Sequence, residues 1–407
     1  MTYIVQKFGG SSVATSERLH HVAEIVQRTR ATGAGVVAVV SAMGNTTDEL
    51  IALAHEVNAD PPSREMDMLL STGETVTAPL LAMALSSIGV EAISLTGAQA
   101  GIRTSASHRS ARIRQVVPER ILDALQRGVV PVVAGFQGMT DELDVTTLGR
   151  GGSDTSAVAL AVAVGADRCE IYTDVAGVYT ADPRVVPEAR LLPEINYEEM
   201  LEFAAVGARV MHLRAVEIGE AYDMPIWVRS SFTDEPGTVI HRNPVSHMED
   251  RKHVRGIASE SNVAKVTVLG VPDRPGIAAA LFTPLGANQI NVDIIVQNVS
   301  HDGLSDVSFT IAQSDLPAAQ KVLSDVTLAI GARGVDARAD IAKVSVVGTG
   351  VRHTPGVFAT AFRALADAKI NIEMISSSEI ALTCIVDARQ MDEAAAALHR
   401  AFELDKL

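Results

Sequence analysis

A lysine beside two glycines near the start of the chain has the residue types of a phosphate-binding turn. The segment reads Lys7-Phe8-Gly9-Gly10-Ser11-Ser12 and directly follows a short aliphatic run at residues 3–6. Glycines permit a positive φ and close approach of the backbone to a ligand. Successive N–H groups in such a turn form an anion-binding nest, to which the lysine adds a compact positive charge. A plain strand–helix turn with a surface lysine would carry the same residues.

The charge distribution favours the phosphate interpretation. The 407 residues carry 34 basic and 49 acidic side chains, a net charge of −15. Residues 1–250 hold 19 of the basic and 32 of the acidic side chains, and Lys7 is their only lysine. Lysine binds phosphate as a point charge and arginine as a planar fork, so one ammonium beside a glycine turn indicates a specific need. Because the net charge repels nucleic acid and anionic lipid, neither is expected as a partner.

A second glycine-rich segment reads Gly149-Arg150-Gly151-Gly152-Ser153-Asp154-Thr155-Ser156, before an Ala/Val-rich helical run at residues 157–164. Ser153 or Asp154 is a natural N-cap for that helix. The glycines let an anion approach the helix N-terminus, where the macrodipole is positive, and Arg150 can fork onto a carboxylate. We predict an anion site here, with a capped buried helix after a flexible loop as the alternative.

A third polar segment, residues 172–184, surrounds a glycine turn with two acids, two tyrosines and a terminal arginine. It could bind a nucleotide through base stacking, ribose contacts and a phosphate-facing arginine, but a polar surface loop fits equally. Residues 41–47 and Gly73-Glu74 are further candidates after apolar or helical stretches. The chain has no G-x-x-x-x-G-K-[ST] and no G-x-G-x-x-G segment, so P-loop and dinucleotide-binding classes are unsupported.

Several other classes are excluded by composition. The eleven histidines show no paired ligand spacing, and Cys169 and Cys384 form neither a CxxC pair nor a disulfide framework. No metal ligand among the protein side chains is therefore assigned, and a reducing cytoplasm is expected. The longest apolar runs, such as residues 157–166, are shorter than the ~18–20 residues that span a bilayer. The N-terminus shows no signal-peptide pattern.

Short aliphatic strands alternating with helices must position these motifs. Helix-like residues 16–29 are followed by strand-like runs at residues 36–40, 93–95, 129–134 and 169–173. This alternation predicts a mostly parallel sheet covered on both faces, with ligands at the carboxyl edge of its strands. The polar stretch at 241–253 is interpreted as a linker, although a long surface loop is also possible.

An internal repeat follows the polar stretch. Residues 264–270 (AKVTVLG) match residues 342–348 (AKVSVVG), Pro275-Gly276 matches Pro355-Gly356, and residues 290–295 match residues 370–375. The offset is 78 residues in the first block and 80 in the other two. Each copy reads as strand, Pro-Gly turn, helix, strand and strand, a small α+β unit suited to pairing with its copy.

The three motifs, their order and the twin C-terminal units resemble aspartate kinase over essentially the whole chain. The resemblance implies an α/β chain: an αβα sandwich with a mostly parallel sheet, the amino-acid-kinase fold, over residues 1–240. A linker at 241–253 would precede two C-terminal α+β, ferredoxin-like ACT domains, at 264–337 and at 254–263 with 338–407. It further implies transfer of phosphate from ATP, with Mg²⁺, to the β-carboxylate of L-aspartate. The product, 4-phospho-L-aspartate, opens the routes to lysine, threonine and methionine.

The resemblance also assigns site residues. Lys7, Asp154 and Arg209 are implied to be catalytic, although many family members have lysine where this chain has Arg209. Substrate contacts are implied for Ser41, Thr47, Glu74, Arg150, Gly151, Gly152 and Ser153. Nucleotide contacts are implied for Lys7, Phe8, Gly9, Gly10, Thr173, Asp174, Tyr179, Thr180, Ala181, Asp182, Pro183 and Arg184.

Lysine or threonine, or both, are implied as allosteric effectors bound by the twin units. The residues implied are Asp273, Arg274, Pro275, Gly276, Ile277, Ala278, Asn291, Val292, Asp293 and Gln297 in the first copy, and Thr354, Pro355, Gly356, Val357, Asn371, Ile372, Glu373, Ser378 and Glu379 in the second. A homo-oligomer or an α/β assembly through the ACT domains is expected. Met248 is where an internal start would fall if the gene also encodes a separate regulatory subunit.

Two rival functions are weighed against this one. A kinase acting on glutamate, acetylglutamate or a nucleoside monophosphate would share the first 240 residues, but the twin units argue against it. A non-catalytic amino-acid sensor with a vestigial kinase fold is opposed by the intact Lys7, Arg150 and Asp154.

Overall fold

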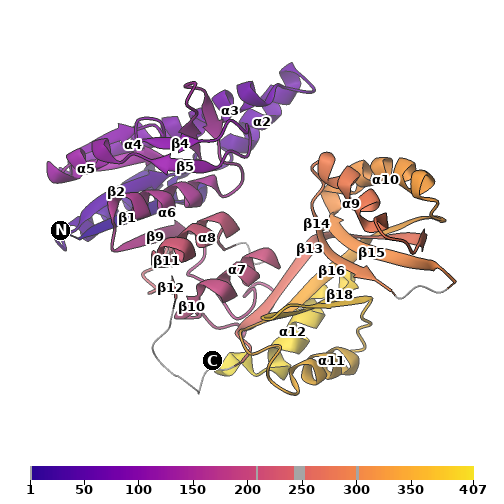
Figure 1. Ribbon diagram of the computed structural model, residues 1–407. Coiled ribbons are helices and arrows are strands. Elements are labelled where there is room, and N and C mark those ends of the chain that lie inside the picture. Colours follow the sequence, from indigo (N-terminus) through magenta and orange to yellow (C-terminus); the bar gives the residue numbers. More distant parts are fainter. Residues whose placement is uncertain (1, 208–209, 243–252, 299–301) are drawn as a thin grey trace. The chain divides into compact units, whose positions relative to one another are not determined.

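The computed structural model of the chain describes every residue except 1, 208–209, 243–252 and 299–301 (Figure 1). The chain divides into two compact units, which are described separately. The first unit comprises Met1–Tyr179, Leu191–Ala205 and Arg209–Arg251. The second comprises Thr180–Arg190, Val206–Ala208 and Lys252–Leu407. We call Thr180–Arg190 the inserted loop. Most of the predicted linker lies outside the described residues.

An eight-stranded sheet forms the centre of the first unit. Its strands run in the order β10 (Glu194–Asn196), β12 (Thr238–His241), β11 (Ile226–Ser230), β9 (Arg168–Thr173), β1 (Tyr3–Phe8), β2 (Gly35–Val40), β6 (Val130–Ala134) and β3 (Ala92–Leu95). All neighbours pair in parallel except β11 and β12. The central strands are almost continuous apolar runs because both of their faces are buried.

Helices cover both faces of this sheet (Figure 1). Those of the first unit are α1 (Ser16–Arg30), α2 (Thr46–Val57), α3 (Ser63–Leu70), α4 (Thr72–Ser87), α5 (Glu119–Gln126), α6 (Gly152–Val164), α7 (Tyr197–Ala205) and α8 (Leu213–Tyr222), with a short 3₁₀ turn η1 (Gly10–Val13). Helices α1 and α4 pack on one face, against Phe8 and Val40. Helix α6 contacts β1 and β9, and it is buried along almost its whole length. The predicted sandwich is therefore confirmed.

A second, smaller sheet lies in the same unit. Its four short strands run in the order β5 (Ile113–Val116), β4 (Ile102–Thr104), β7 (Gln137–Met139) and β8 (Val145–Thr147). The buried Asp67 of α3 joins it to the helices by accepting hydrogen bonds from Thr147 Oγ1 (2.6 Å) and His108 Nδ1 (2.8 Å). Strands of three or four residues carry too little pattern for the sequence to predict them.

Helices α3 and α4 together form a 25-residue helical stretch, Ser63–Ser87, that is long and apolar enough to cross a membrane. Half of its most apolar window is buried, and Leu81 and Leu85 are in the core beneath β2 and β6. The stretch therefore has the burial of a core helix.

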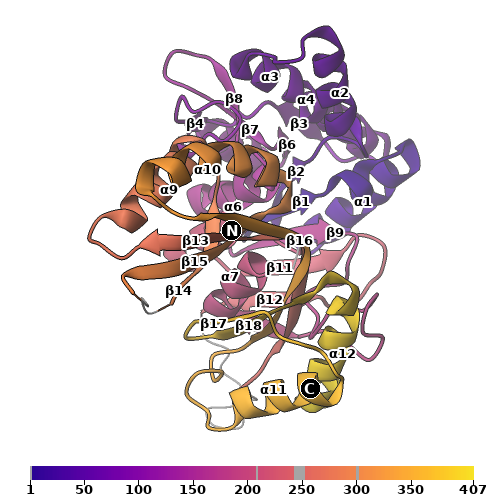
Figure 2. The same cartoon turned by 90° about the vertical axis from the view of Figure 1, so that its right-hand side faces the viewer.

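A six-stranded antiparallel sheet forms the second unit (Figure 2). Its strands run in the order β14 (Val292–Gln297), β15 (Leu304–Ala312), β13 (Gly256–Pro272), β16 (Gly334–Val347), β18 (Ala381–Asp387) and β17 (Met374–Ser377). The helices are α9 (Ile277–Ala287), α10 (Leu316–Ile330), α11 (Val357–Asp367) and α12 (Met391–Ala401), with short 3₁₀ turns η2 (Gln313–Asp315), η3 (Ala388–Gln390) and η4 (Leu404–Lys406). Each predicted copy has the expected strand, Pro-Gly turn, helix and two strands.

The two copies share the long central strands β13 and β16. The first part of β13, from Gly256 to Glu260, pairs with residues 343–347 of β16, beside the second copy. Beyond a register shift, Lys265 to Leu269 pair with residues 334–338 of β16, beside the first copy. Each copy has its own apolar core, and the two cores meet around Val263 and Ile341.

The inserted loop packs in the core of the second copy. Ala181 and Val186 are buried there with Leu398 of α12 and Val346 of β16. A division of the chain at residue 240 places this loop with the first unit. The packing assigns it to the second because its apolar side chains find their partners there.

Candidate active site

The Lys7 ammonium is buried against a carboxylate of α6. Lys7 Nζ lies 2.6 Å from Asp154 Oδ1, and the two side chains are 10% and 13% exposed. Successive residues of β1 point to opposite faces of the sheet, so Lys7 faces α6 while Phe8 packs under α1. Two predicted catalytic residues, 147 positions apart, are thus brought into direct contact.

The glycine turn after β1 differs from the one predicted. Gly9 has a φ of −69°, and its N–H donates to Tyr172 O at 3.0 Å, so it is not a free donor of an anion nest. Close packing explains the glycines instead: a Cβ on Gly10 would lie 2.9 Å from Ala42 O. A Cβ on Gly9 would lie 3.5 Å from Lys7 Nζ, so glycine here keeps the ammonium approachable.

Helix α6 begins beside the ammonium. Its N-cap is Gly151, with a φ of 65°. Ser153 and Asp154, which we predicted as candidates for the N-cap, lie in the first turn instead. A Cβ on Gly151 would lie 2.2 Å from the His212 ring, which explains the glycine by both conformation and space. The amides of a first helical turn lack intrahelical acceptors. The positive end of α6 therefore adds to the charge of Lys7.

Glu74 adds a buried carboxylate from the start of α4. Its Oε1 accepts the Ala42 N–H at 3.0 Å, while Oε2 has no hydrogen-bond partner among the described residues. Burial raises the pKa of Glu74 to about 7, although backbone hydrogen bonds and the charge of Lys7 oppose the shift. An unpartnered buried carboxylate oxygen suits an incoming ammonium group.

The other predicted substrate residues lie on the loops around this group. Ser41 follows β2, and its N–H donates to Phe8 O at 3.1 Å. Thr47 is in the first turn of α2, and both side chains are half-buried. Arg150 is exposed on the loop before α6. Arg209 lies outside the described residues.

Two residues of the site were not predicted. Gly135 follows β6, where a Cβ would lie 3.0 Å from the Ser153 Cβ, so it makes room for the first turn of α6. A glycine directly after a strand-like run was the signal available for it. His212 packs on Gly151, and burial lowers its pKa against the charge of Asp154. A lone histidine gives no signal in a sequence.

Comparisons with known proteins identify the families to which the parts of the chain belong. Residues 2–230 match the amino acid kinase family, and residues 265–327 and 344–402 each match an ACT domain. The chain is 49% identical over 407 residues to an aspartokinase of Mycolicibacterium smegmatis, covering 99% of this chain and 97% of the relative. It is also 49% identical over 405 residues to an aspartate kinase of Pseudomonas putida, with coverages of 100% and 98%.

The chain belongs to the aspartokinase family. Among solved structures, Escherichia coli aspartokinase III in complex with aspartate and ADP matches with a TM-score of 0.83 and 26% identity, over 98% of this chain and 99% of that one. The same enzyme in complex with lysine and aspartate matches with a TM-score of 0.77 and 25% identity, over 98% and 99%. The predicted resemblance and the predicted fold class are confirmed.

The segment that aspartokinase resemblance assigns to the nucleotide is split between the units. In the first unit, Thr173 is the last residue of β9 and Asp174 follows it, with Thr173 Oγ1 donating to Asp174 Oδ1 at 3.0 Å. Tyr179 is half-buried and closes the base of the inserted loop in a bridge with Leu191.

The remaining members of that segment are in the inserted loop. Thr180 and Ala181 are buried in the second unit, which corrects the prediction that their side chains line a pocket. Asp182 and Arg184 form an ion pair of 2.7 Å, and Pro183 beside them is exposed.

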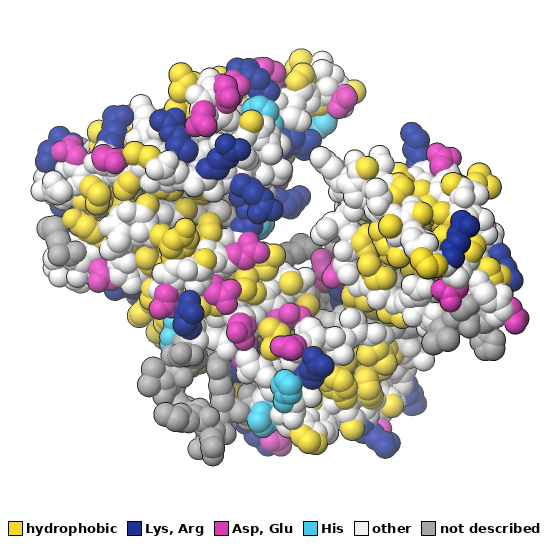
Figure 3. Space-filling model, in the orientation of Figure 1, with side chains coloured by type: hydrophobic (Ala, Val, Ile, Leu, Met, Phe, Trp, Pro, Cys, Tyr) yellow, Lys and Arg dark blue, Asp and Glu magenta, His cyan; other side chains and the backbone are white. Residues whose placement is uncertain are grey.

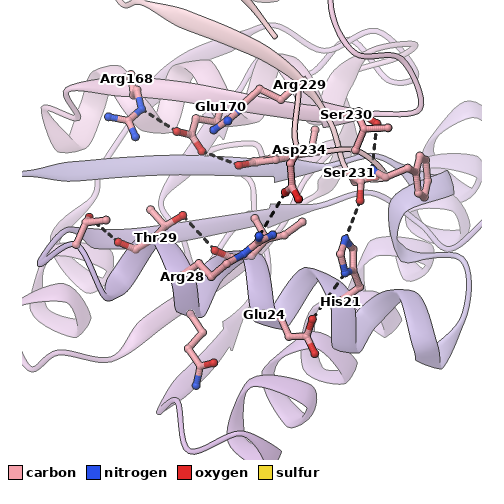
Figure 4. Close-up of a pocket in the computed structure, with 16 residues that line it drawn as sticks. His21, Glu24, Arg28, Thr29, Arg168, Glu170, Arg229, Ser230, Ser231 and Asp234 are labelled. Atoms are coloured by element: carbon pink, nitrogen blue, oxygen red, sulfur yellow. Dashed lines mark hydrogen bonds and ion pairs between the residues drawn. The ribbon is translucent and has the colours of Figure 1, made fainter. Parts of the chain in front are cut away.

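A cavity of about 720 Å³ lies on the opposite face of the sheet from Lys7 (Figure 4). It lies between α1 and β9 and includes Glu170, whose carboxylate binds Arg168 Nε at 2.7 Å and Tyr172 Oη at 3.0 Å. Tyr172, the first residue of the polar segment 172–184, lines this cavity, but none of the residues that the resemblance assigns to substrate or nucleotide does. Those assignments therefore do not place the active site here.

The predicted effector residues of the two ACT domains occupy equivalent places. Gly276 and Gly356 cap α9 and α11 in the left-handed region, with φ of 89° and 97°. Most of the predicted set is exposed or half-buried: Asp273, Arg274, Pro275, Ala278, Asn291, Val292, Asp293, Gln297, Thr354, Pro355, Asn371, Ile372, Glu373, Ser378 and Glu379. The residues that directly follow these glycines, Ile277 and Val357, are buried in the core of their copies.

Two of the four acids of that set, Asp293 and Glu373, are already paired with lysines. Lys343 of the second copy binds Asp293 of the first, and Lys265 of the first lies 3.6 Å from Glu373 of the second. These lysines are the matching residues of the repeat. The two crossed ion pairs therefore link the two ACT domains in a pseudo-symmetric way.

Proposed function

We propose that this aspartokinase-family chain transfers the γ-phosphoryl group of ATP to the β-carboxylate of L-aspartate. The bond from phosphorus to the β-phosphate oxygen breaks, a bond to the carboxylate oxygen forms, and ADP and 4-phospho-L-aspartate leave. The observation that carries the proposal is the buried Lys7–Asp154 pair beside the start of α6, with the unpartnered oxygen of Glu74 near it in the charge network.

The chemistry requires placed charge rather than a general base. An aspartate side chain with an ordinary pKa near ~3.9 is already ionised at neutral pH, so no proton need be removed from the nucleophile. The barrier comes from bringing one anion against a triphosphate. In the proposal, Lys7 and the first-turn amides of α6 stabilise the charge on the transferring group, and Asp154 fixes the position of the ammonium.

Glu74 and Arg150 are proposed to hold the aspartate. The free Oε2 of Glu74 would accept the substrate ammonium, and the exposed Arg150 would close on a carboxylate. Ser41, Thr47, Gly151, Gly152 and Ser153 would add hydrogen bonds from the surrounding loops. These contacts favour an acid with an α-ammonium group over an acetylated one.

The nucleotide is proposed to lie at Lys7, Gly9 and Gly10 and beside Thr173, Asp174, Tyr179, Asp182, Pro183 and Arg184, with Arg209 as a further cation. Among the described residues no cluster of three or more His, Cys, Asp or Glu side chains could hold a metal ion. In the proposal Mg²⁺ enters with the phosphates, where it would neutralise part of their charge. The reaction is placed in the cytoplasm.

We further propose that lysine or threonine regulates the enzyme through the ACT domains. The proposed reaction would be the first committed step toward lysine, threonine and methionine. A homo-oligomer or an α/β assembly would form through these domains. Ile295 and Ile375, equivalent residues of the edge strands β14 and β17, are 51% and 47% exposed. Hydrophobic side chains gather on the face of the second unit seen in Figure 3. Both observations are consistent with a second copy of the chain binding to these apolar side chains.

A coupled ADP-release assay tests the function. L-Aspartate, L-glutamate, N-acetyl-L-glutamate and no acid are compared, each with and without lysine and threonine. Turnover with L-aspartate alone, reduced by an effector, is expected. Turnover with another acid identifies a different amino-acid kinase, and effector binding without turnover on any acid identifies a sensor.

A further inference from the structure

The inserted loop connects the proposed nucleotide segment to the second ACT domain. The chain leaves the first unit after Tyr179 and returns at Leu191. Within the loop, Thr180 N–H donates to Arg190 O at 2.8 Å, and Arg190 N–H donates to Thr180 Oγ1 at 2.9 Å. Thr180 is fully buried, so this closed base is the rigid part of the loop.

Two hydrogen bonds, one between backbone groups and one from a side chain, join the loop to the second ACT domain. Ile257 N–H, at the start of β13, donates to Thr180 O at 2.7 Å. Arg190 Nε donates to Asp405 O at 3.0 Å, near the C-terminus. Ala181 and Val186 are buried in the same core, so the loop is packed as part of this domain.

One side chain of α12 joins this set. His399 is fully buried, and its Nε2 lies 2.9 Å from Thr180 Oγ1. Its Nδ1 has no hydrogen-bond partner among the described residues. Burial lowers the pKa of His399, although the charges of Asp405 and Glu188 oppose the shift. A half-satisfied buried imidazole is costlier than an apolar residue, so stability alone does not account for it.

We propose that His399 is a positioning residue for the nucleotide site. Through Thr180 it holds the base of the inserted loop, which carries Asp182, Pro183 and Arg184 of the proposed nucleotide set. The inference rests on the proposed nucleotide role of this segment. It predicts that a change at α12, deep in a regulatory domain, alters ATP affinity before it alters the chemical step.

Steady-state kinetics of the full chain test the proposal. His399→Leu removes the hydrogen bond at similar volume, His399→Gln retains a polar group there, and Thr180→Val removes the bond from the loop side. We expect Leu and Val to raise KM for ATP about three- to tenfold, the loss of one hydrogen bond, with kcat and KM for aspartate changed less than about twofold. His399→Gln should keep KM for ATP close to that of the unmodified chain. The double variant, His399→Leu with Thr180→Val, should have the same KM for ATP as either single variant.

Thr383→Val is the matched control. It removes one hydroxyl of the buried Ser345–Thr383 pair (2.8 Å) in the same sheet, away from the loop. It should lower the melting temperature without changing KM for ATP. A KM for ATP that shifts equally in this control, or in none of the variants, overturns the proposal.

Limited trypsin digestion gives a readout that needs no turnover. His399→Leu should speed cleavage within the inserted loop, after Arg184 and Arg190, relative to Thr383→Val, and ADP should slow it. If the unmodified chain shows no aspartate-dependent ADP release, the proposed function has failed. If it does, and cleavage and KM for ATP are unchanged in the variants, only the positioning role has failed.

Discussion

Lys7 of the first unit and Lys343 of the second are both buried lysines paired with carboxylates, yet only one of them fits a catalytic role. The Lys343 side chain is 7% exposed and serves two acids, Asp293 and Glu260, the latter at 3.5 Å. Lys7 is 10% exposed and has the single partner Asp154 in its ion pair. The difference is in the neighbours: glycine beside Lys7 keeps space at its ammonium, whereas Lys343 lies in mid-strand between two charged side chains. A buried ammonium is therefore a candidate site only where the backbone leaves an approach to it.

The largest effect that would test this comparison is expected for Lys7→Ala. Without the ammonium, the charge on the transferring phosphoryl group loses its main side-chain partner, so kcat should fall at least about a thousandfold. Circular dichroism should show a folded chain, and turnover is measured by ADP release. Near-normal turnover would remove Lys7 from the site.

Glu74→Gln is expected to give the next largest effect. A neutral amide cannot pair with the substrate ammonium, so KM for aspartate should rise about ten- to a hundredfold with a smaller change in kcat. In the unmodified enzyme, KM for aspartate should rise as the pH falls below about 7, the pKa of Glu74. The Gln variant should lack that pH dependence, and an unchanged profile would show that another group binds the ammonium.

Glu74 also gives the stability curve a definite sign. Between the ordinary value of 4.5 and about 7, the folded state holds a proton that the unfolded state has released. Stability of the first unit should therefore decrease as the pH rises through this window, and Glu74→Gln should remove that slope. Thermal unfolding at several pH values measures it.

Lys343→Met is the counterpart of Lys7→Ala in the second unit. It leaves Asp293 and Glu260 without their shared cation, but Asp293 is about half exposed, so we expect a loss of only about 1–3 kcal/mol. The thermal midpoint should fall by a few degrees while kcat in the absence of effectors stays within about twofold. A loss of kcat comparable with that of Lys7→Ala would erase the distinction between the two lysines.

Lys265→Met is expected to give the smallest effect. Its contact with Glu373 is 3.6 Å, and Glu373 keeps Arg338 at 2.5 Å. The loss should be below about 1 kcal/mol. A loss as large as that for Lys343→Met would mean that the two crossed pairs contribute equally, which thermal unfolding of both variants in parallel can establish.

The sequence predicted much of this architecture because its signals are local. Strand-like runs, the glycine motifs and the 78–80-residue repeat all lie within short stretches, and each appears as an element of the structure. Lys7 and Asp154 were named from their motifs, but their direct contact depends on β1 and α6 packing together across 147 positions.

Other features could not be read from local pattern. The role of Gly10 depends on Ala42 O, and the N-cap of α6 depends on the space left by His212, so both were misjudged. The inserted loop belongs to the second unit because Ala181 packs with Leu398, which is more than two hundred residues further along the chain. Such features depend on tertiary packing, which the hydrophobic periodicity of a sequence does not reveal.

The two strands that run through both ACT domains have a consequence for cooperativity. Because β13 and β16 each supply hydrogen bonds to both copies, neither copy can melt without exposing strand edges of the other. The second unit should thus unfold in a single calorimetric transition, whereas two independent domains would unfold in two. A fragment cut between the copies should be insoluble, while one that starts in the stretch around Met248, which lies outside the described residues, would keep both shared strands whole.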